Sequence, residues 1–320
     1  MYRALRPMTL PDGAYPHIND VVAVQKPAAL VPMLETAYGW DGDPELGALL
    51  AEALGDAPRN TLEALLFGAD RIERINALTP IGSYSNKGLS ILRDGSAYLM
   101  VKHSDGGNEH DHFDRLGLSF MAQGEQMAPD IGTVYYGHPL HWSWFKTTLS
   151  HNTVLLGGLP HPPGRAGVTV ATDRVIDAWA EWPKSQDYYS GARFRRRIEW
   201  RGDHFIDQFE VATEMPTRVE YVFHTRGVLQ TAPPGRPYTE WNPLPPYRHL
   251  TDLTARPVAT AELRWAFSNG ATLTADVQTK GLLITGRSPD YPWSKQRSTL
   301  LLRQEEQTHT TFTVVYTIGG

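Results

Sequence analysis

The sequence of 320 residues contains no cysteine, which excludes disulfide-stapled folds and metal sites that depend on thiolate ligands. Any metal ion must therefore be held by histidine, aspartate or glutamate. The sequence also lacks an apolar run of about 18 residues, the length that a membrane-spanning helix needs. We therefore expect no membrane partner.

An excess of positive charge is missing as well. The formal net charge is -5 and the pI is near 6.2, so bulk charge does not attract nucleic acid, and we expect no nucleic-acid partner. No basic-then-apolar leader follows Met1. As given, the sequence predicts a cytoplasmic location, or a periplasmic or secreted one if the natural N-terminus lies further upstream.

The first quarter of the sequence has the pattern of helices. Asp43-Pro44 is typical of a helix start and Gly55 of a helix end, with leucines at helical spacing between them. Asn60 with Glu63 resembles a capping box for a second short helix. Residues 27–38 form a weaker candidate, because a proline interrupts them.

From about residue 79 the pattern changes to short alternating segments between turn signals. Asp94-Gly95 and Asn269-Gly270 each separate two such segments and predict hairpins. Roughly a dozen short strands without intervening helices favour an antiparallel sandwich. We therefore expect a helical segment over residues 1–78 and a mainly β domain, an antiparallel β-sandwich, over residues 79–320.

Histidines are concentrated between residues 103 and 161, with seven of the 12 in the chain. In an extended segment, His110 and His112 would place both imidazoles on one face. Asp130 and His151 would complete a set of nitrogen and oxygen ligands that zinc accepts. Taken alone, such a His-x-His pair is more often a surface or hydrogen-bonded core feature.

Aromatic residues surround this histidine-rich region. Tyr135 and Tyr136 could act as acid or base if a neighbouring charge stabilised the phenolate, but a structural role in a strand is favoured from position alone. Trp142, Trp144 and Phe145 would suit a sugar-binding cleft or, equally, the sandwich core. The run Arg193 to Arg197 indicates a solvated strand face, with Arg196 on the side opposite its two neighbours.

Four motifs in fixed order resemble the heparinase II/III-like polysaccharide lyases, a superfamily of heparin and heparan lyases and exo-acting oligoalginate lyases. They occupy residues 109–116, 129–132, 136–140 and 147–154. More loosely, residues 11–20 are similar to the end of the family's helical toroid. The resemblance implies a β-sandwich (super-sandwich) domain with an N-terminal helical remnant of an (α/α) toroid.

The resemblance also implies roles for individual residues. It implies one divalent metal ion, zinc, with a mainly structural role. The implied residues are His112, Asp130 and His151 as metal ligands, His110 and Tyr136 as catalytic residues, and Tyr135, Trp144 and Arg115 as substrate-binding residues, with Tyr135 also the alternative to Tyr136. His110 would donate to the substrate carboxylate and Tyr136 would shuttle a proton.

The implied reaction is β-elimination at a uronic acid in an acidic polysaccharide, either heparan- or heparin-like or alginate-like. The family's carboxylate-neutralising Asn or His and a further Tyr would lie upstream of Pro11, outside this sequence. Whether this chain is an enzyme on its own therefore stays open, and a non-catalytic, metal-stabilised carbohydrate-binding or assembly module is the alternative. A metal-dependent hydrolase is a third possibility. Exposed helical faces predict self-association or a toroid-bearing partner.

Overall fold

The computed structural model describes residues 6–23, 26–72, 82–95, 97–185, 188–239 and 244–320. The chain divides into two compact units, one formed by residues 1–16 and 23–82 and the other by residues 17–22 and 83–320. The boundary predicted between residues 78 and 79 lies outside the described residues. None of the described helices is long and apolar enough to cross a membrane.

The first unit is helical. Its α-helices are α1 (Val31–Asp41), α2 (Pro44–Leu54) and α3 (Leu62–Leu66), with 3-10 turns at Arg6–Met8 and Pro27–Leu30. The prediction for α2 is confirmed: the Asp43 side chain accepts a hydrogen bond from the backbone N–H of Glu45 at 2.7 Å, and Gly55 caps the other end. The residues therefore start and stop this helix as the sequence indicates.

Two details of the helical prediction were wrong. Thr61, not Asn60, caps α3, because its side chain accepts from the Ala64 N–H at 3.1 Å. Pro32 does not interrupt α1 but lies in its first turn, where the missing N–H would have no helical partner anyway. The helix consequently runs on to Gly42, whose φ of 64° is left-handed.

The second unit is an antiparallel β-sandwich, as predicted. Its smaller sheet contains, in order, β1 (Tyr84–Ser85), β2 (Leu89–Asp94), β3 (Ala97–Lys102), β4 (Leu118–Ala122) and β5 (Glu125–Ala128). The main path of the 12-stranded sheet is β11 (Val228–Thr231), β14 (Ala261–Ala266), β15 (Thr272–Val277), β17 (Gln296–Gly319), β10 (His204–Thr225), β9 (Arg193–Trp200), β8 (Val175–Glu181) and β7 (Arg165–Ala171). Four further strands join it: β6 (Val154–Leu156) beside β10, β16 (Gly281–Pro289) beside β17, β13 (Thr251–Val258) beside β16, and β12 (Arg236–Pro237) beside β13.

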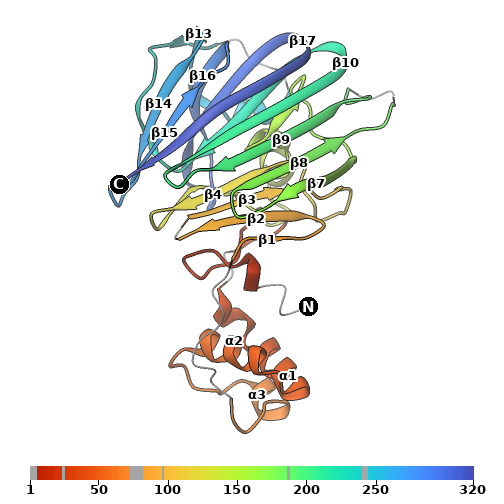
Figure 1. Ribbon diagram of the computed structural model, residues 1–320, viewed down its shortest axis with the longest axis vertical. Coiled ribbons are helices and arrows are strands. Elements are labelled where there is room, and N and C mark those ends of the chain that lie inside the picture. The colour runs from red at the N-terminus through yellow and green to blue at the C-terminus, as the bar shows by residue number, and fades with distance from the viewer. Residues whose placement is uncertain (1–5, 24–25, 73–81, 96, 186–187, 240–243) are drawn as a thin grey trace. The chain divides into compact units, whose positions relative to one another are not determined.

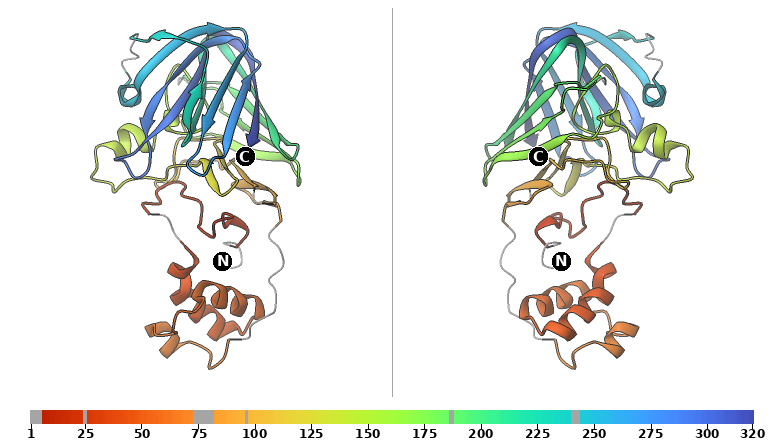
Figure 2. Two further views of the ribbon diagram at one scale, coloured as in Figure 1. Left: turned by 90° about the vertical axis from the view of Figure 1, so that its left-hand side faces the viewer. Right: turned by 90° about the vertical axis from the view of Figure 1, so that its right-hand side faces the viewer.

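Both predicted hairpins are confirmed, as β2–β3 and β14–β15. Gly95 and Gly270 have positive φ values of 57° and 91°, the conformation that these tight turns require. The long strands β10 and β17 run side by side along the large sheet (Figure 1). Figure 2 gives side views of the same sandwich.

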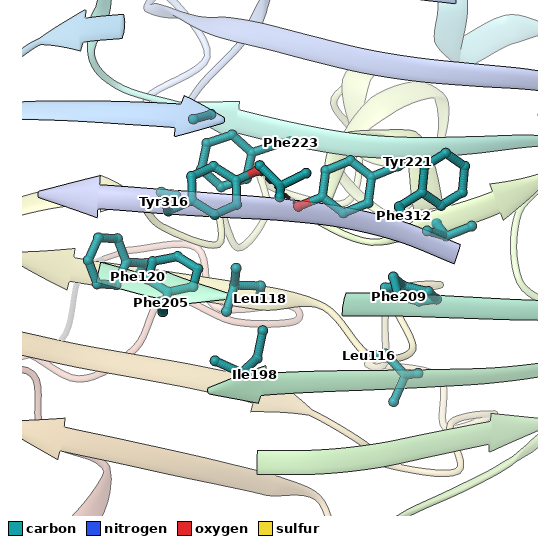
Figure 3. Packing of buried hydrophobic residues seen from close by; sticks show 14 of the residues in the cluster. Leu116, Leu118, Phe120, Ile198, Phe205, Phe209, Tyr221, Phe223, Phe312 and Tyr316 are labelled. Carbon is teal, nitrogen blue, oxygen red and sulfur yellow. Dashed lines mark hydrogen bonds between the residues drawn. The ribbon is translucent and has the colours of Figure 1, made fainter. Parts of the chain in front are cut away.

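One hydrophobic cluster joins the two sheets. It includes Phe120 from the small sheet and Phe205, Tyr221 and Tyr316 from the large sheet. The rings of Phe120 and Phe205 lie 5.0 Å apart, and the buried hydroxyls of Tyr221 and Tyr316 share a hydrogen bond of 2.9 Å (Figure 3). Buried aromatic pairs of this kind contribute beyond their apolar area.

Arg196 in β9 links this core to the loops that contain Leu116 and Asn152. As alternation predicts, it faces away from Arg195, but the expectation of a solvated face does not hold for it because it is fully buried. Its guanidinium pairs with Asp207 at 2.5 Å and donates to the backbone carbonyls of Leu116 and Asn152, at 2.6 Å each. The strand β9 therefore fixes the ends of two loops that carry the candidate site.

Candidate functional site

The predicted His-x-His pair lies in the loop between β3 and β4, not in an extended strand. A turn closed by the Asp111 N–H on the Asn108 carbonyl at 3.0 Å redirects the chain here. As a result the His110 side chain is 74% exposed and the His112 side chain is fully buried. The two imidazoles nevertheless converge, because both contact the same carboxylate, that of Asp20.

Asp20 is the centre of a hydrogen-bonded cluster. Its Oδ1 lies 3.1 Å from Nε2 of His112, and its Oδ2 lies 3.1 Å from Nδ1 of His110 and 3.2 Å from the Tyr136 hydroxyl. The Tyr136 hydroxyl and His110 Nδ1 are 2.9 Å apart. Burial alone would raise the pKa of Asp20, but the hydrogen bonds from the two histidines lower it to about 2. Asp20 is therefore an anion that holds three site residues.

His112, Asp130 and His151 form a compact group of possible metal ligands. Each offers one ligand atom, and these atoms all lie within 4.8 Å of one another. Nδ1 of His151 is 3.3 Å from the Asp130 carboxylate. Nε2 of His112 faces Asp20 and Nε2 of His151 lies 3.1 Å from the Phe145 carbonyl. Nδ1 of His112 lies 3.3 Å from Nε2 of His151, and Nδ1 of His151 faces Asp130, so the Nδ1 atoms of both rings contact other members of the group. An oxygen beside the other nitrogen is the usual support of a metal-bound histidine.

The donor set fits a divalent cation. Oδ2 of the neighbouring Asp114 is buried and has no hydrogen-bond partner among the described residues, and the buried Nδ1 of His151 has the 3.3 Å contact with Asp130. Two imidazoles and a carboxylate are a common zinc environment. Desolvation lowers the pKa of His112, which favours the neutral ring that binds metal. Desolvation would raise the pKa of Asp130, but the His151 charge outweighs it and keeps the carboxyl ionised. Burial would lower the pKa of His151, but the charges of Asp130 and Asp114 raise it, so a metal ion would displace the proton that His151 holds.

A buried lysine fastens the Asp20 segment to the loop. Lys102 pairs with Asp111 at 2.6 Å and Asp114 at 2.7 Å, and it also donates to the side-chain carbonyl of Asn19. Burial lowers the pKa of Lys102, but the two carboxylates raise it by more. Asn19 has a φ of 54°, a left-handed conformation that asparagine tolerates. The lysine thus ties residues 17–22 to the site.

These residues border a cleft of about 550 Å³, a volume within the range of small-molecule sites. Trp142 is 63% exposed at this cleft, and Lys146 Nζ lies 4.9 Å from its ring centroid. The cleft is lined by Asp20, Gly107, Asn108, Glu109, His110, Asp111, His112, Phe113, Arg115, Tyr136, His141, Trp142, Lys146 and Pro163.

Three residues predicted to bind substrate are placed differently from one another. Trp144 is fully buried in the second hydrophobic cluster and its indole N–H donates to the Pro289 carbonyl. The prediction that Trp144 contacts substrate is therefore wrong. Arg115 borders the cleft, but its guanidinium donates hydrogen bonds to the backbone carbonyls of Asp105 and His112. Tyr135 is 65% exposed and packs against His138, outside the cleft lining.

Asp20 and Lys102 are site residues that sequence reasoning missed. Asp20 belongs to the segment that resembles the end of the toroid, so that similarity was the available signal. The spacing of neighbouring residues could not identify either one, because their partners in the site are distant in the chain. His110 and His112 lie 90 and 92 positions from Asp20.

Comparisons with known proteins agree with this fold. A family model described as heparinase II/III-like, C-terminal, matches residues 76–313. Among solved structures, a heparinase III has a TM-score of 0.68 at 14% identity, and the heparan sulfate lyase HepC from Pedobacter heparinus has a TM-score of 0.67 at 12% identity. Both alignments cover 99% of this chain but only 45% and 46% of the other chain, so this chain spans less than half of their length. No curated protein sequence matches. The predicted resemblance and the sandwich fold are thereby confirmed.

Proposed function

Because this chain belongs to the heparinase II/III-like C-terminal domain family, we propose that it takes part in the cleavage of uronic-acid glycans by β-elimination. One observation carries the proposal. The Asp20 carboxylate holds the His110 imidazole and the Tyr136 hydroxyl 2.9 Å from each other at a cleft. A hydrogen-bonded base and acid beside a substrate-sized cleft are what an elimination needs.

The cluster supports a division of roles. With Asp20 and Tyr136 both at Nδ1 of His110, that nitrogen carries the proton, and Nε2 has no partner among the described residues. Nε2 is therefore free to accept a proton. Desolvation and the Asp20 charge raise the pKa of Tyr136, which keeps the phenol protonated at neutral pH and suits it to donate.

The proposed step balances as follows. The C5–H bond of the uronate breaks and its proton moves to His110 Nε2, while the electron pair forms the C4=C5 double bond. The C4–O4 bond breaks, and O4 takes the proton of Tyr136. The imidazolium then returns a proton from Nδ1 to the phenolate across their 2.9 Å hydrogen bond. The product is an unsaturated uronate. The ring then carries its proton at Nε2 only, so loss of that proton to solvent and reprotonation of Nδ1 restore the starting tautomer before the next turnover.

We assign zinc to His112, Asp130 and His151, with a mainly structural role. A bound divalent ion would supply positive charge that holds three loop segments together. Asp20 would support His112 through Nε2 and at the same time orient His110 through its other oxygen. The metal ligands and the proton-transfer pair would thus share one carboxylate.

The remaining requirement is neutralisation of the substrate carboxylate. Lys146 borders the cleft, but its ammonium donates to the Glu109 carbonyl. Since the chain spans less than half of the related lyases, we expect a second helical part to supply this function. A heparan-like glycan is the leading substrate, because the structural relatives are a heparinase III and a heparan sulfate lyase, and an alginate-like glycan is the alternative.

Adjacent tyrosines provide a matched test. The full chain is incubated with heparan sulfate, heparin and alginate, and ultraviolet absorbance of the unsaturated product is followed. We expect Tyr136→Phe to reduce the rate by about 10²–10⁴-fold, the usual contribution of a general acid. The control Tyr135→Phe removes a hydroxyl outside the cleft and should retain the rate. Equal rates for the two variants would refute the role of Tyr136.

A carbohydrate-binding module is the second candidate function. The observation in its favour is Trp142, which presents a largely exposed ring at the cleft where a sugar face could stack. Calorimetric titration with the same glycans separates the candidates. Binding that Trp142→Ala abolishes, with no unsaturated product from the unmodified chain, would support the module and refute catalysis by this chain on its own.

The helical unit has its own proposed partner surface. Large apolar side chains are exposed along it, namely Met33, Trp40, Leu62, Leu65, Leu66 and Phe67. Exposed apolar patches are typical of interfaces, so we propose self-association or a toroid-bearing partner here. Sedimentation of the chain with and without Leu65→Glu tests self-association, which the charged variant should weaken.

A further inference from the structure

Arg297 is a buried cation without an ion pair. It lies in β17 and is 2% exposed, yet within the described ranges no carboxylate reaches ion-pair distance. Other buried arginines of the large sheet differ in this respect: Arg196 pairs with Asp207 and Arg303 with Glu220. Burying a guanidinium without a carboxylate partner is unfavourable, so packing alone does not account for it.

The hydrogen bonds of Arg297 identify what it holds. Its NH2 group donates to the Ser150 carbonyl at 2.5 Å, and its NH1 group reaches the Pro129 carbonyl at 3.5 Å. Those residues directly precede His151 and Asp130, two of the three possible metal ligands. One planar guanidinium therefore contacts both ligand-bearing segments, which are separated by about 20 positions in the chain.

A histidine of the neighbouring strand β10 reinforces the same turn. His224 is fully buried, and its Nε2 lies 2.7 Å from the Leu149 carbonyl. Its Nδ1 lies 2.9 Å from the hydroxyl of Thr299 and 3.2 Å from that of Ser288. Thr299 is two residues from Arg297 in β17 and Ser288 pairs with Arg297 in the sheet, so these groups form one buried polar layer.

We propose that Arg297 and His224 are positioning residues that set the places of Asp130 and His151 for metal binding. This inference rests on the zinc site assigned above. The large sheet thereby fixes the distance between ligands that come from different loops. Loss of either residue should weaken metal binding even though neither contacts the ion. Residues outside the ligand set typically alter metal affinity by about 10–100-fold.

The test compares two buried arginines of the same strand. Zinc affinity of the full chain is measured by competition with a chromogenic chelator, and the fold of each variant is checked by near-ultraviolet circular dichroism. We expect Arg297→Lys to lower the affinity by about 10–100-fold. The control Arg303→Lys disturbs a buried pair with Glu220 that contacts neither ligand segment, and should leave the affinity unchanged while lowering the free energy of unfolding.

The outcomes are separable. A folded Arg297→Lys protein with unchanged zinc affinity would overturn the proposal, and so would an equal loss in Arg303→Lys. If Arg297→Lys does not fold, His224→Gln decides, with a weaker zinc affinity expected and an unchanged one contradicting the role. Failure of the unmodified chain to bind zinc would overturn the zinc site and this inference together. Zinc binding without lyase activity would refute catalysis by this chain on its own and leave the roles of Arg297 and His224 unaffected.

Discussion

The Asp20 carboxylate serves three side chains with two oxygen atoms. One oxygen is used by the buried His112, and the other by the exposed His110 and by Tyr136. An ionised carboxylate can accept several hydrogen bonds at once, whereas an amide of the same shape offers one acceptor oxygen. The charge and the second oxygen of Asp20 are therefore both needed to keep this cluster together.

This argument predicts the behaviour of Asp20→Asn. The amide cannot accept on both sides, so we expect zinc affinity to fall by about 10–100-fold and the elimination rate to fall with it. Chelator competition and initial rates on heparan sulfate measure the two effects. The exposed turn residue Asp203 provides the control Asp203→Asn, which should change neither. An Asp20→Asn protein with full zinc affinity and full rate would show that the cluster has no such function.

Individual site residues differ in how far the sequence could predict them. The motifs identified His112, Asp130 and His151, and the structure brings these three together. The convergence of His110 and His112 was expected from strand alternation, but it results from a turn and a shared carboxylate. Trp144 and Trp142 could not be distinguished, because burial depends on how the π-helical turn His141–Phe145 packs on strands distant in sequence.

At the scale of elements, β9 shows how one strand serves two environments. Arg196 is buried against Asp207, while Arg195 on the opposite face pairs with Asp177 with 48% of its side chain exposed. Removing one partner of a buried pair leaves an uncompensated charge. The Arg195 pair is half exposed, since Asp177 is buried, but Asp177 also has Arg197 at 3.6 Å and keeps that cation when Arg195 is lost. Solvent screening of the exposed Arg195 also limits its contribution.

Substitutions on the two faces of β9 should therefore lower the free energy of unfolding by different amounts. Arg196→Met should lower the free energy of unfolding by about 3–5 kcal/mol. The variant leaves the buried Asp207 carboxylate without its cation and the carbonyls of Leu116 and Asn152 without a hydrogen-bond donor. The neighbouring Arg195→Met should cost about 1 kcal/mol or less. Urea unfolding followed by tryptophan fluorescence measures both. Similar values for the two variants would contradict this account of β9.

Elements whose ends are marked by local chemistry could be predicted from the sequence. The hairpins at Asp94-Gly95 and Asn269-Gly270 and the helix capped by Asp43 depend on neighbouring residues only. The errors came from choices between adjacent candidates, as with Thr61 and Asn60. The assignment of strands to two sheets was beyond such reasoning, since β6 pairs with β10 across more than 60 positions.

At the scale of the whole molecule, acid stability depends on buried neutral histidines. His161 is 1% exposed, accepts from the Arg115 N–H at Nδ1 and donates from Nε2 to the Val154 carbonyl at 2.7 Å. Burial, and then the Arg115 charge, lower its pKa from 6.5 to about 3, although the Val154 carbonyl and Asp114 act in the opposite direction. The folded state thus holds a neutral ring that the unfolded chain protonates below pH 6.5.

The sign of the effect follows from proton binding. Above pH 6.5 neither state protonates His161, so its contribution is fully present, and as the pH falls towards 3 the unfolded state is increasingly favoured. At one pKa unit per 1.36 kcal/mol, the loss between pH 6.5 and 4 is on the order of 3 kcal/mol.

His161→Gln keeps a polar side chain but does not titrate, so its unfolding free energy should be lower at neutral pH and change less between about pH 7 and 4. The carboxylates are the same in both proteins, so their contribution to the pH dependence of the unfolding free energy cancels when the two curves are compared. Parallel stability curves for the two proteins would mean that the folded state also protonates His161, so that its pKa is not lowered by folding.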